Sequence, residues 1–355
     1  MKLHLVALPH TQVSKAFEGC AYTGKVRKFC KMMKDHYEIL LYAPEGPKVE
    51  GATLIPCLSN TERQNTFGKD DPSRLPDWPT DAQTAMFNLN VIEGLQGNVA
   101  KEDLVLLTGG RTHLPIAQTL TENIYAEWTV GYEGVIGGGI FAAFESYSWL
   151  AHVYAKMNVN DVRYYDRVIP PYYDTADFPK LNKGDGQYLA FLGRRIERKG
   201  LKTAAIIAAA AKMPLLVAGA GTMTVDDVEG ADVTYLGPLD VKARAKFLSK
   251  AKALLVPTTY LEPGGNVAIE AMACGTPVIA TDQGVFAETV DHGLSGYRFR
   301  LLREAVWAVN NLQELEPRVI RDYARNKYSL EAISVRFAQW FEALGTLRGA
   351  GWYTP

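Results

Sequence analysis

The chain has 355 residues, of which 47% are hydrophobic and 22% charged, and its formal net charge is −1. This composition excludes a mainly disordered chain, and the nearly balanced charge gives no overall attraction to nucleic acid or anionic lipid. The length exceeds that of one ordinary core and predicts two domains of roughly 150–180 residues each.

Neither a membrane span nor a secretory leader is indicated. The longest strongly apolar stretch, Ala204 to Ala211, falls well short of the roughly 18–20 residues that a bilayer-spanning helix needs. The apolar run at the N-terminus reaches Pro9 too soon to serve as the core of a signal peptide. We therefore expect a cytoplasmic protein. Its four cysteines include no C-x-x-C pair, which favours reduced thiols over disulfides or a zinc site.

The first half alternates strand-length apolar runs with helical patterns, which predicts a parallel sheet with helices on both faces. The polar stretch 59–80, with three prolines, is predicted to be a surface loop. The predicted strands are Leu3–Leu8, Tyr37–Tyr42, Thr53–Leu58, Leu104–Leu107 and Trp128–Tyr132. The predicted helices are Gly24–Met33, Ala82–Leu95 and Ser146–Met157.

After a polar linker rich in Pro and Gly, the same alternation restarts and predicts a second open α/β sheet. We place the domains at 1–178 and 179–328, followed by a C-terminal helical segment at 329–355. The predicted strands are Tyr188–Leu192, Pro214–Ala218, Val233–Leu236, Ala253–Pro257 and Pro277–Thr281. The predicted helices are Leu201–Lys212, Val241–Lys250, Val267–Ala273 and Leu330–Leu347.

The last predicted helix has an apolar face that must pack against another element. Three tryptophans at helical positions, Trp149, Trp307 and Trp340, are predicted to be core residues and not platforms for a sugar. The apolar face consists of Ile333, Phe337, Trp340, Phe341 and Leu344.

A glycine-bounded basic loop follows the first strand of the second domain. It contains Gly193, Arg194 and Lys199, with two further arginines, and leads into a helix. Open α/β sheets bind ligands at the carboxyl ends of their strands, and guanidinium and ammonium groups near a helix N-terminus suit a diphosphate. A solvated basic loop is the alternative.

The next strand ends in Gly219-Ala220-Gly221, where the absence of Cβ atoms can let a ligand approach the backbone. The full G-x-G-x-x-G spacing is missing because residue 224 is Thr. A dinucleotide-binding site therefore loses support.

The strongest motif runs from Glu262 through Pro263, Gly264, Gly265 and Asn266 to Glu270. It predicts one carboxylate at the exit of a strand, a glycine turn, and a second carboxylate inside the following helix. Two acceptors around a helix N-terminus suit a ligand that carries both phosphate and hydroxyl groups, which points to a sugar. A pair of surface glutamates is the alternative.

These motifs, in this order, resemble the donor half of the retaining GT-B glycosyltransferases of family 4. The resembling set also includes Tyr235-Leu236-Gly237 and the run from Glu270 to Ala280. The first domain resembles, more loosely, a bacterial and phage offshoot of that family. The resemblance implies two Rossmann-like domains facing a cleft, with the C-terminal helix crossing back to the first domain.

The resemblance also implies how a nucleotide-diphosphate sugar, most simply a UDP-sugar, is held. Arg194 and Lys199 bind the diphosphate, Glu270 the ribose hydroxyls, and Glu262 a hydroxyl of the donor sugar. The turn of Gly264, Gly265 and Asn266 covers sugar and phosphate, and the backbone of Tyr235 and Leu236 reads the base. Relatives usually carry a side chain where Gly264 stands, so the sugar pocket differs here.

No Asp-x-Asp occurs in the chain, so we expect catalysis without a metal, with Arg194 and Lys199 neutralising the leaving diphosphate. Retention in such families is attributed to front-face attack and not to a flanking pair of carboxylates. We therefore nominate no nucleophile and expect no cofactor besides the donor substrate.

First-domain candidates lie where strands end. Gly24 is placed near the donor phosphate, with Lys25 beside it, and an ordinary glycine at a helix start is the alternative. His113 and Glu133 follow two predicted strands and could contact hydroxyls of sugar or acceptor, although lone residues of these types in loops are often structural or solvated.

A basic patch on the first predicted helix gives the one sequence lead to the acceptor. It comprises Lys25, Arg27, Lys28, Lys31 and Lys34. We expect a solvated helix face and a saccharide or glycoconjugate acceptor. Hydroxylated DNA bases, reached through the patch, or a protein hydroxyl are alternatives. Two rivals stay open: a sugar-nucleotide epimerase or glycan phosphorylase of the same fold, and a non-catalytic nucleotide-sugar-binding protein.

Overall fold

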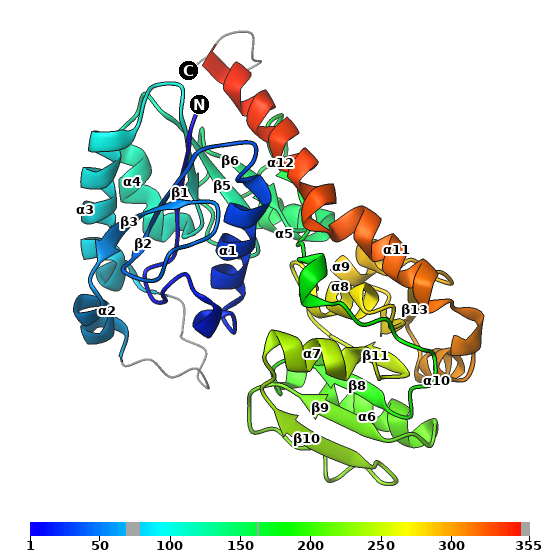
Figure 1. Ribbon diagram of the computed structural model, residues 1–355. Coiled ribbons are helices and arrows are strands. Elements are labelled where there is room, and N and C mark those ends of the chain that lie inside the picture. Colours follow the sequence, from blue (N-terminus) through cyan, green and yellow to red (C-terminus); the bar gives the residue numbers. More distant parts are fainter. Residues whose placement is uncertain (69–78, 162, 349–355) are drawn as a thin grey trace. The chain divides into compact units, whose positions relative to one another are not determined.

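The computed structural model describes residues 1–68, 79–161 and 163–348, and the chain divides into two compact units (Figure 1). Unit 1 comprises Met1–Glu145, Leu150–Pro170 and the chain from Ile333, and unit 2 comprises Ser146–Trp149 and Pro171–Ala332. Residues 171–178 and 329–332 thus group with unit 2, although the sequence analysis assigns them to the first domain and to the C-terminal segment. The insertion of 146–149 into unit 2 has no counterpart in that analysis.

Unit 1 is built on a parallel sheet whose described strands follow the order β3-β2-β1-β4-β5-β6-β7. The order reverses between β1 and β4, so the carboxyl ends of these two strands flank the crevice where such sheets bind ligands. The strands are β1 (Leu3–Val6), β2 (Ile39–Pro44), β3 (Thr53–Leu58), β4 (Leu104–Leu107), β5 (Ile124–Val130), β6 (Phe141–Phe144) and β7 (Arg167–Val168).

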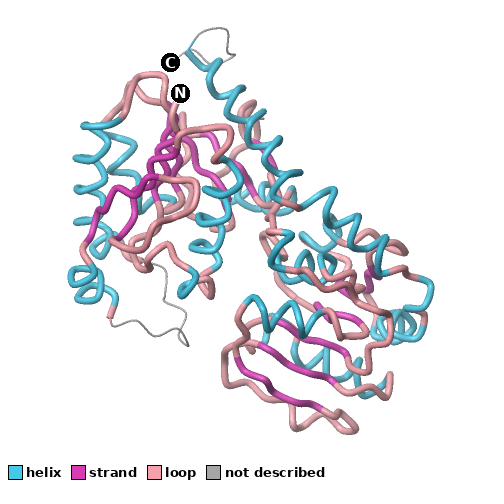
Figure 2. Tube along the Cα trace, in the orientation of Figure 1, coloured by secondary structure: helices cyan, strands magenta, loops and turns pink. Residues whose placement is uncertain are grey.

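Helices flank this sheet (Figure 2). They are α1 (Ala21–Met33), α2 (Asn60–Phe67), α3 (Asp81–Asn98), α4 (Leu114–Thr119) and α5 (Tyr147–Lys156). The prediction of a loop at 59–80 is wrong for α2, where Ser59 and Glu62 form a reciprocal capping box that satisfies the first N–H groups of the helix. The rest of that prediction, 69–78, lies outside the described residues.

The C-terminal helix α12 (Leu330–Gly345) packs its apolar face inside unit 1. The ring of Phe337 lies 5.2 Å from that of Phe29 and 6.2 Å from that of Trp128. The indole N–H of Trp340 donates to the carbonyl oxygen of Tyr165 at 2.7 Å. The predicted burial of Ile333, Phe337, Trp340, Phe341 and Leu344 is confirmed.

Unit 2 repeats the architecture with a parallel sheet in the order β10-β9-β8-β11-β12-β13. The predicted α/β class with two doubly wound parallel sheets is therefore confirmed. The strands are β8 (Leu189–Leu192), β9 (Leu215–Ala218), β10 (Val233–Gly237), β11 (Ala253–Val256), β12 (Val278–Thr281) and β13 (Gly296–Phe299). The helices are α6 (Leu201–Ala210), α7 (Val241–Leu248), α8 (Asn266–Ala273), α9 (Val285–Thr289), α10 (Leu302–Asn310) and α11 (Pro317–Tyr328).

Burial agrees with most of the predicted core. All four residues of β4 and of β11 are buried, as expected for strands covered on both faces. Trp149 and Trp340 are buried as predicted, but the prediction is wrong for Trp307, which is 50% exposed on α10. Within the described part of the chain, no helix has the length and apolarity needed to cross a bilayer.

Candidate active site

The basic loop after β8 and the acidic loop after β11 meet at the point where the strand order of unit 2 reverses. Lys199 Nζ lies 2.5 Å from Glu262 Oε2, although the two residues are 63 positions apart. Their side chains are 17% and 16% exposed. The backbone N–H of Thr259 donates to the carbonyl oxygen of Arg198 at 3.0 Å, which fastens the two loops together. The structure thus joins the two strongest predicted motifs at one edge of the sheet.

An aromatic ring supports the cations of this site. The Tyr260 ring lies under the Arg198 guanidinium at 4.4 Å and under Lys199 Nζ at 5.3 Å, in the range of cation–π contacts. Burial, reinforced by the neighbouring Glu262 carboxylate, raises the pKa of the Tyr260 hydroxyl above its ordinary value. Arg194 is exposed, and among the described residues no hydrogen bond or ion pair engages its side chain. Its guanidinium is available to an anion.

The glycines of the next loop serve close packing of the backbone. A Cβ on Gly219 would lie 1.9 Å from the carbonyl oxygen of Gly193, and one on Gly221 would lie 2.8 Å from that of Arg195. The backbone N–H of Arg195 also donates to Ala220 O at 2.7 Å. The missing side chains therefore let this loop approach the basic loop after β8. Close packing of two loops thus explains the two glycines, whereas the sequence predicted that they make room for a ligand.

The turn before α8 presents a helix N-terminus beside Glu262. Gly265, the residue that precedes the helix, has φ +62°, a left-handed conformation that suits glycine. Asn266 Oδ1 is buried and has no hydrogen-bond partner among the described residues. The Pro263 carbonyl oxygen accepts from the Ser146 hydroxyl at 2.7 Å and so holds the turn in place. Gly264 is buried in the same turn. The first N–H groups and the dipole of α8 can bind an anion here.

The second carboxylate of the motif has its own cation. Arg244 Nη2 of α7 lies 3.0 Å from Glu270 Oε1 of α8, and these side chains are 19% and 12% exposed. The sequence analysis missed Arg244 because no motif surrounds it. The sequence offers only one indication of its role: Arg244 is a basic residue in the predicted helix that follows the strand of Tyr235 and Leu236.

Tyr235 and Leu236 lie on β10, the edge strand of the sheet of unit 2. The Tyr235 hydroxyl accepts from the backbone N–H of Val225 at 2.9 Å, and its ring lies 5.0 Å from the guanidinium of Arg195. Leu236 is 42% exposed. The strand is held in place by these contacts while its outer surface stays accessible.

In unit 1, the predicted basic patch is neutralised by its own carboxylates. Lys25 is buried in an ion pair with Glu145, and Thr129 Oγ1 donates to the same carboxylate at 2.9 Å. Arg27 pairs with Glu18, and Lys34 pairs with Glu50 at 2.8 Å. Lys28 and Lys31 are half-buried and also engaged in interactions. The expected solvated helix face is found only in part, since Lys34 is exposed but Lys25 is buried, and a nucleic acid partner has no support from the patch.

Gly24 lies buried in the first turns of α1. Its backbone N–H donates to the carbonyl oxygen of Cys20 at 3.1 Å. A Cβ added at Gly24 would have one neighbour within 4 Å, the carbonyl oxygen of Glu18 at 3.8 Å, so the space beside this glycine is open within unit 1.

The two remaining first-domain candidates have opposite surroundings. His113 is fully buried, burial lowers its pKa to about 3, and both ring nitrogens have no partner among the described residues. The ring packs against Gly109, where a Cβ would lie 2.4 Å away. Glu133 is 48% exposed and accepts from His152 Nε2 at 2.9 Å and Lys156 Nζ at 2.5 Å, which lowers its pKa. It lies beyond the end of β5, which finishes at Val130 and not at the predicted position.

Glu127 of β5 is a buried acid that the sequence analysis missed. Its carboxylate accepts from the Tyr132 hydroxyl at 2.9 Å and from the backbone N–H of Ile136 at 2.7 Å, and it thereby holds the loop that follows the strand. Burial raises the pKa of Glu127 to about 7. An acidic residue inside the apolar run 124–130 was the available signal.

This environment predicts a pH dependence of stability. A folded-state pKa of about 7 lies above the ordinary value of 4.5, so protonated Glu127 favours the folded state and this stabilisation is lost as pH rises from about 4.5 through 7. We expect Glu127→Gln to remove about 2 kcal/mol of the decline in unfolding free energy between pH 5 and pH 7.5. Urea unfolding at both pH values measures it, with Glu133→Gln as the control. Equal declines in wild type and Glu127→Gln would contradict the assignment.

Known proteins that resemble this chain in sequence are glycosyltransferases. Residues 174–316 match the family model of glycosyl transferases group 1. A phosphatidyl-myo-inositol mannosyltransferase of Propionibacterium freudenreichii is 38% identical over 159 residues, which is 41% of each chain. A D-inositol 3-phosphate glycosyltransferase of Mycobacterium leprae is 35% identical over 127 residues, 32% of this chain and 29% of that one. The matches thus span less than half the length of these relatives.

Solved structures resemble nearly the whole chain. A glycosyltransferase involved in avilamycin A biosynthesis superposes with a TM-score of 0.69 over 98% of each chain, at 19% identity. Anabaena HepE, solved in complex with UDP and glucose, gives a TM-score of 0.66 at 15% identity, over 96% of this chain and 99% of that one. These likenesses identify the GT-B fold that the sequence motifs predict.

Proposed function

We propose that the protein moves a sugar from a nucleotide-diphosphate sugar to a hydroxyl acceptor with retention of configuration. The chain has the GT-B glycosyltransferase fold, and its residues 174–316 match the family model of glycosyl transferases group 1. The observation that carries the proposal is the Lys199–Glu262 pair at the reversal point of the sheet of unit 2. A cation for phosphate and a carboxylate for sugar hydroxyls lie there in contact.

Each part of the donor has a group of matching chemistry in unit 2. We assign the diphosphate to Arg194, Lys199 and the N-terminus of α8, since the first is unpaired and the last carries a partial positive charge. Glu270 binds the ribose hydroxyls, and Glu262 binds a hydroxyl of the donor sugar. The backbone of Tyr235 and Leu236 contacts the base, and Gly264, Gly265 and Asn266 close over sugar and phosphate.

The chemical contribution of these residues is electrostatic. As the bond between sugar and diphosphate breaks, negative charge grows on the leaving group, and Arg194 and Lys199 stabilise it from fixed positions. Glu262 forms an ion pair with Lys199 and orients the sugar. In unit 1 we assign contacts with sugar or acceptor to Gly24, His113 and Glu133. The two unpaired nitrogens of His113 support that role, because a hydroxyl can satisfy them.

We propose a UDP-sugar as donor and a saccharide or glycoconjugate as acceptor, used in the cytoplasm. The donor choice is supported by the UDP bound in the Anabaena structure, and the acceptor choice by the inositol compounds named for the matched relatives. Hydroxylated DNA and protein hydroxyls have no comparable support. A non-catalytic nucleotide-sugar-binding protein is the second alternative.

The test has two stages. The purified protein is incubated with UDP-glucose, UDP-galactose, GDP-mannose and ADP-glucose, and release of free nucleotide diphosphate is followed. Slow hydrolysis of one donor is expected, whereas binding without turnover under any acceptor condition would favour the non-catalytic alternative. Labelled sugar is then offered with small glycosides, inositol phosphates, hydroxymethylated DNA and envelope extract. Label found only on DNA would reject the saccharide proposal.

A further prediction concerns metal dependence. Because Arg194 and Lys199 supply the positive charge at the diphosphate, we expect EDTA to leave transfer within about twofold of the untreated rate. A manganese titration after EDTA provides the control. Loss of activity on chelation, with recovery in manganese, would show that the two cations do not suffice.

A further inference from the structure

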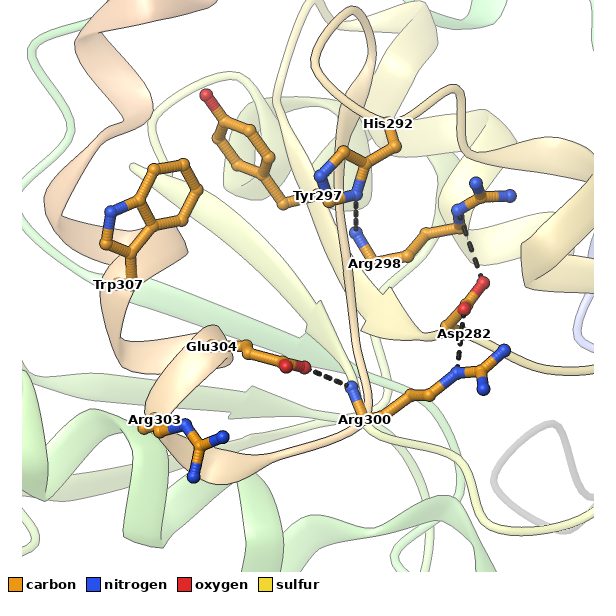
Figure 3. A pocket seen from close by; sticks show the side chains of 8 residues that line it. All are labelled: Asp282, His292, Tyr297, Arg298, Arg300, Arg303, Glu304 and Trp307. Carbon is orange, nitrogen blue, oxygen red and sulfur yellow. Dashed lines mark hydrogen bonds and ion pairs between the residues drawn. The ribbon is translucent and has the colours of Figure 1, made fainter.

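A second hollow of unit 2 lies at the ends of β12 and β13 and is about 610 Å³ in volume (Figure 3). Its walls come from Asp282 after β12, from Arg298 and its neighbours on β13, and from Trp307 on α10. None of the donor-binding residues proposed above lines it. We therefore consider it as a separate site.

One wall is aromatic and rigidly held. The Trp307 ring lies 5.2 Å from the Tyr297 ring, and the two are nearly perpendicular at 75°. The His292 ring packs on Tyr297 at 5.4 Å, and the Tyr297 hydroxyl donates to Glu314 Oε2 at 3.1 Å. Trp307 is nevertheless 50% exposed. A fixed indole with an accessible surface is suited to the apolar face of a sugar ring.

Arginines lie on both sides of the hollow: Arg298 and Arg300 opposite Trp307, and Arg303 on α10, the helix that also carries Trp307 (Figure 3). Arg300 is 76% exposed and donates through Nε to Asp282 Oδ2 at 2.9 Å, while its outer nitrogens contact no acceptor among the described residues. Arg298 approaches Asp282 Oδ1 at 3.4 Å and donates to Ala287 O at 2.5 Å. No hydrogen bond or ion pair joins the Arg303 side chain to any other residue that the structure describes.

The acidic and basic groups of the lining do not cancel. Asp282 is occupied by two arginines, and the Glu304 carboxylate accepts from the backbone N–H groups of Arg300 and Leu301 at 2.8 and 3.0 Å. His292 Nδ1 accepts from the backbone N–H of Arg298. Because both carboxylates are engaged and three arginines face them, an entering ligand meets excess positive charge.

We propose that this hollow binds a saccharide that carries a phosphate or carboxylate group. The sugar ring lies on the Trp307 indole, and the guanidinium groups of Arg300 and Arg303 pair with the anionic group. A neutral sugar lacks the second contact and a simple anion lacks the first, so the site discriminates against both. None of the residues proposed to act in sugar transfer belongs to this hollow, so ligand binding to it can be measured without enzymatic turnover.

Titration calorimetry of the full chain with glucose 6-phosphate and with glucuronate tests it, with glucose and inorganic phosphate as matched controls. We expect each anionic sugar to bind at least about tenfold more tightly than glucose or phosphate. Arg300→Gln with Arg303→Gln is expected to abolish that preference, and Trp307→Ala to weaken both anionic sugars. Arg318→Gln, an exposed arginine on α11, should leave binding unchanged.

Three results would overturn the proposal. Equal affinity for glucose and the anionic sugars would remove the role of the arginines. Inorganic phosphate binding as tightly as glucose 6-phosphate would remove the role of Trp307. Tight UDP binding that is lost in Trp307→Ala would identify the hollow as a nucleotide site. Melting temperatures of all variants, compared with that of Arg318→Gln, ensure that lost binding is not lost folding.

Discussion

Replacing Lys199 with methionine is expected to lower kcat/KM for transfer by about 100- to 1,000-fold. The ammonium group is the half-buried partner of Glu262 and one of two cations assigned to the leaving diphosphate. Methionine keeps most of the apolar stem but no charge, so the departing group loses stabilisation and Glu262 loses its ion pair. Initial rates of nucleotide diphosphate release over a range of donor concentrations measure the effect.

The chain offers a matched control three residues away. Lys202 is 56% exposed and pairs with the exposed Asp227, so Lys202→Met removes an equivalent charge outside the proposed site. We expect that variant to retain kcat/KM within about twofold, in line with the small contribution of surface ion pairs. A Lys199→Met enzyme as active as Lys202→Met would show that the switch-point pair does not serve the reaction.

The second large effect separates the two glutamates of the motif. Glu262→Gln is expected to reduce kcat by about 100-fold with little change in the Kd for UDP, because its carboxylate is assigned to the sugar. Glu270→Gln is expected to raise the Kd for UDP by about tenfold or more, because its carboxylate is assigned to the ribose. Calorimetry with UDP and steady-state kinetics, run on both variants, give the two quantities independently.

Arg244→Gln serves as the control for the second glutamate. If Glu270 only anchors α7 to α8, then Glu270→Gln and Arg244→Gln should lower the melting temperature and the UDP affinity alike. If Glu270 contacts ribose, its variant loses far more UDP affinity than the Arg244 variant at similar stability. Identical kinetic and binding profiles for Glu262→Gln and Glu270→Gln would reject the division of roles.

Burial on both faces explains where sequence reasoning succeeds in the fold. The run Ala253–Val256 is recognisable because a strand covered on both sides must be continuously apolar. Strand β7 was missed because two residues give too little pattern, and the four-residue strands β6 and β13 were missed as well. Helix α2 was missed because its polar composition outweighed the Ser59–Glu62 capping signal.

In the candidate site, the positions of the key residues could be predicted from the sequence, but their partners could not. Placing Lys199 and Glu262 near one sheet edge needs only the order of strands and the rule that parallel strands end together. Their ion pair, and that of Lys25 with Glu145 across 120 positions, depend on how particular loops and helices pack. Residue type and spacing carry no information on such distant partners. The same is true of Trp307, whose helical position suggests a core residue although its indole reaches the surface.

The interleaving of the two units has a consequence for biosynthesis. The core of unit 1 contains Phe29 and Trp128 packed against Phe337, which follows the whole of unit 2 in the sequence. Chains usually fold domain by domain as they emerge from the ribosome. Until Phe337 is synthesised, the apolar surface of unit 1 that it covers stays exposed. During that time unit 2, whose last strand ends at Phe299, can already fold. A chain truncated before α12 would therefore lack part of the core of unit 1, and nascent chains halted there should bind chaperones through residues translated long before.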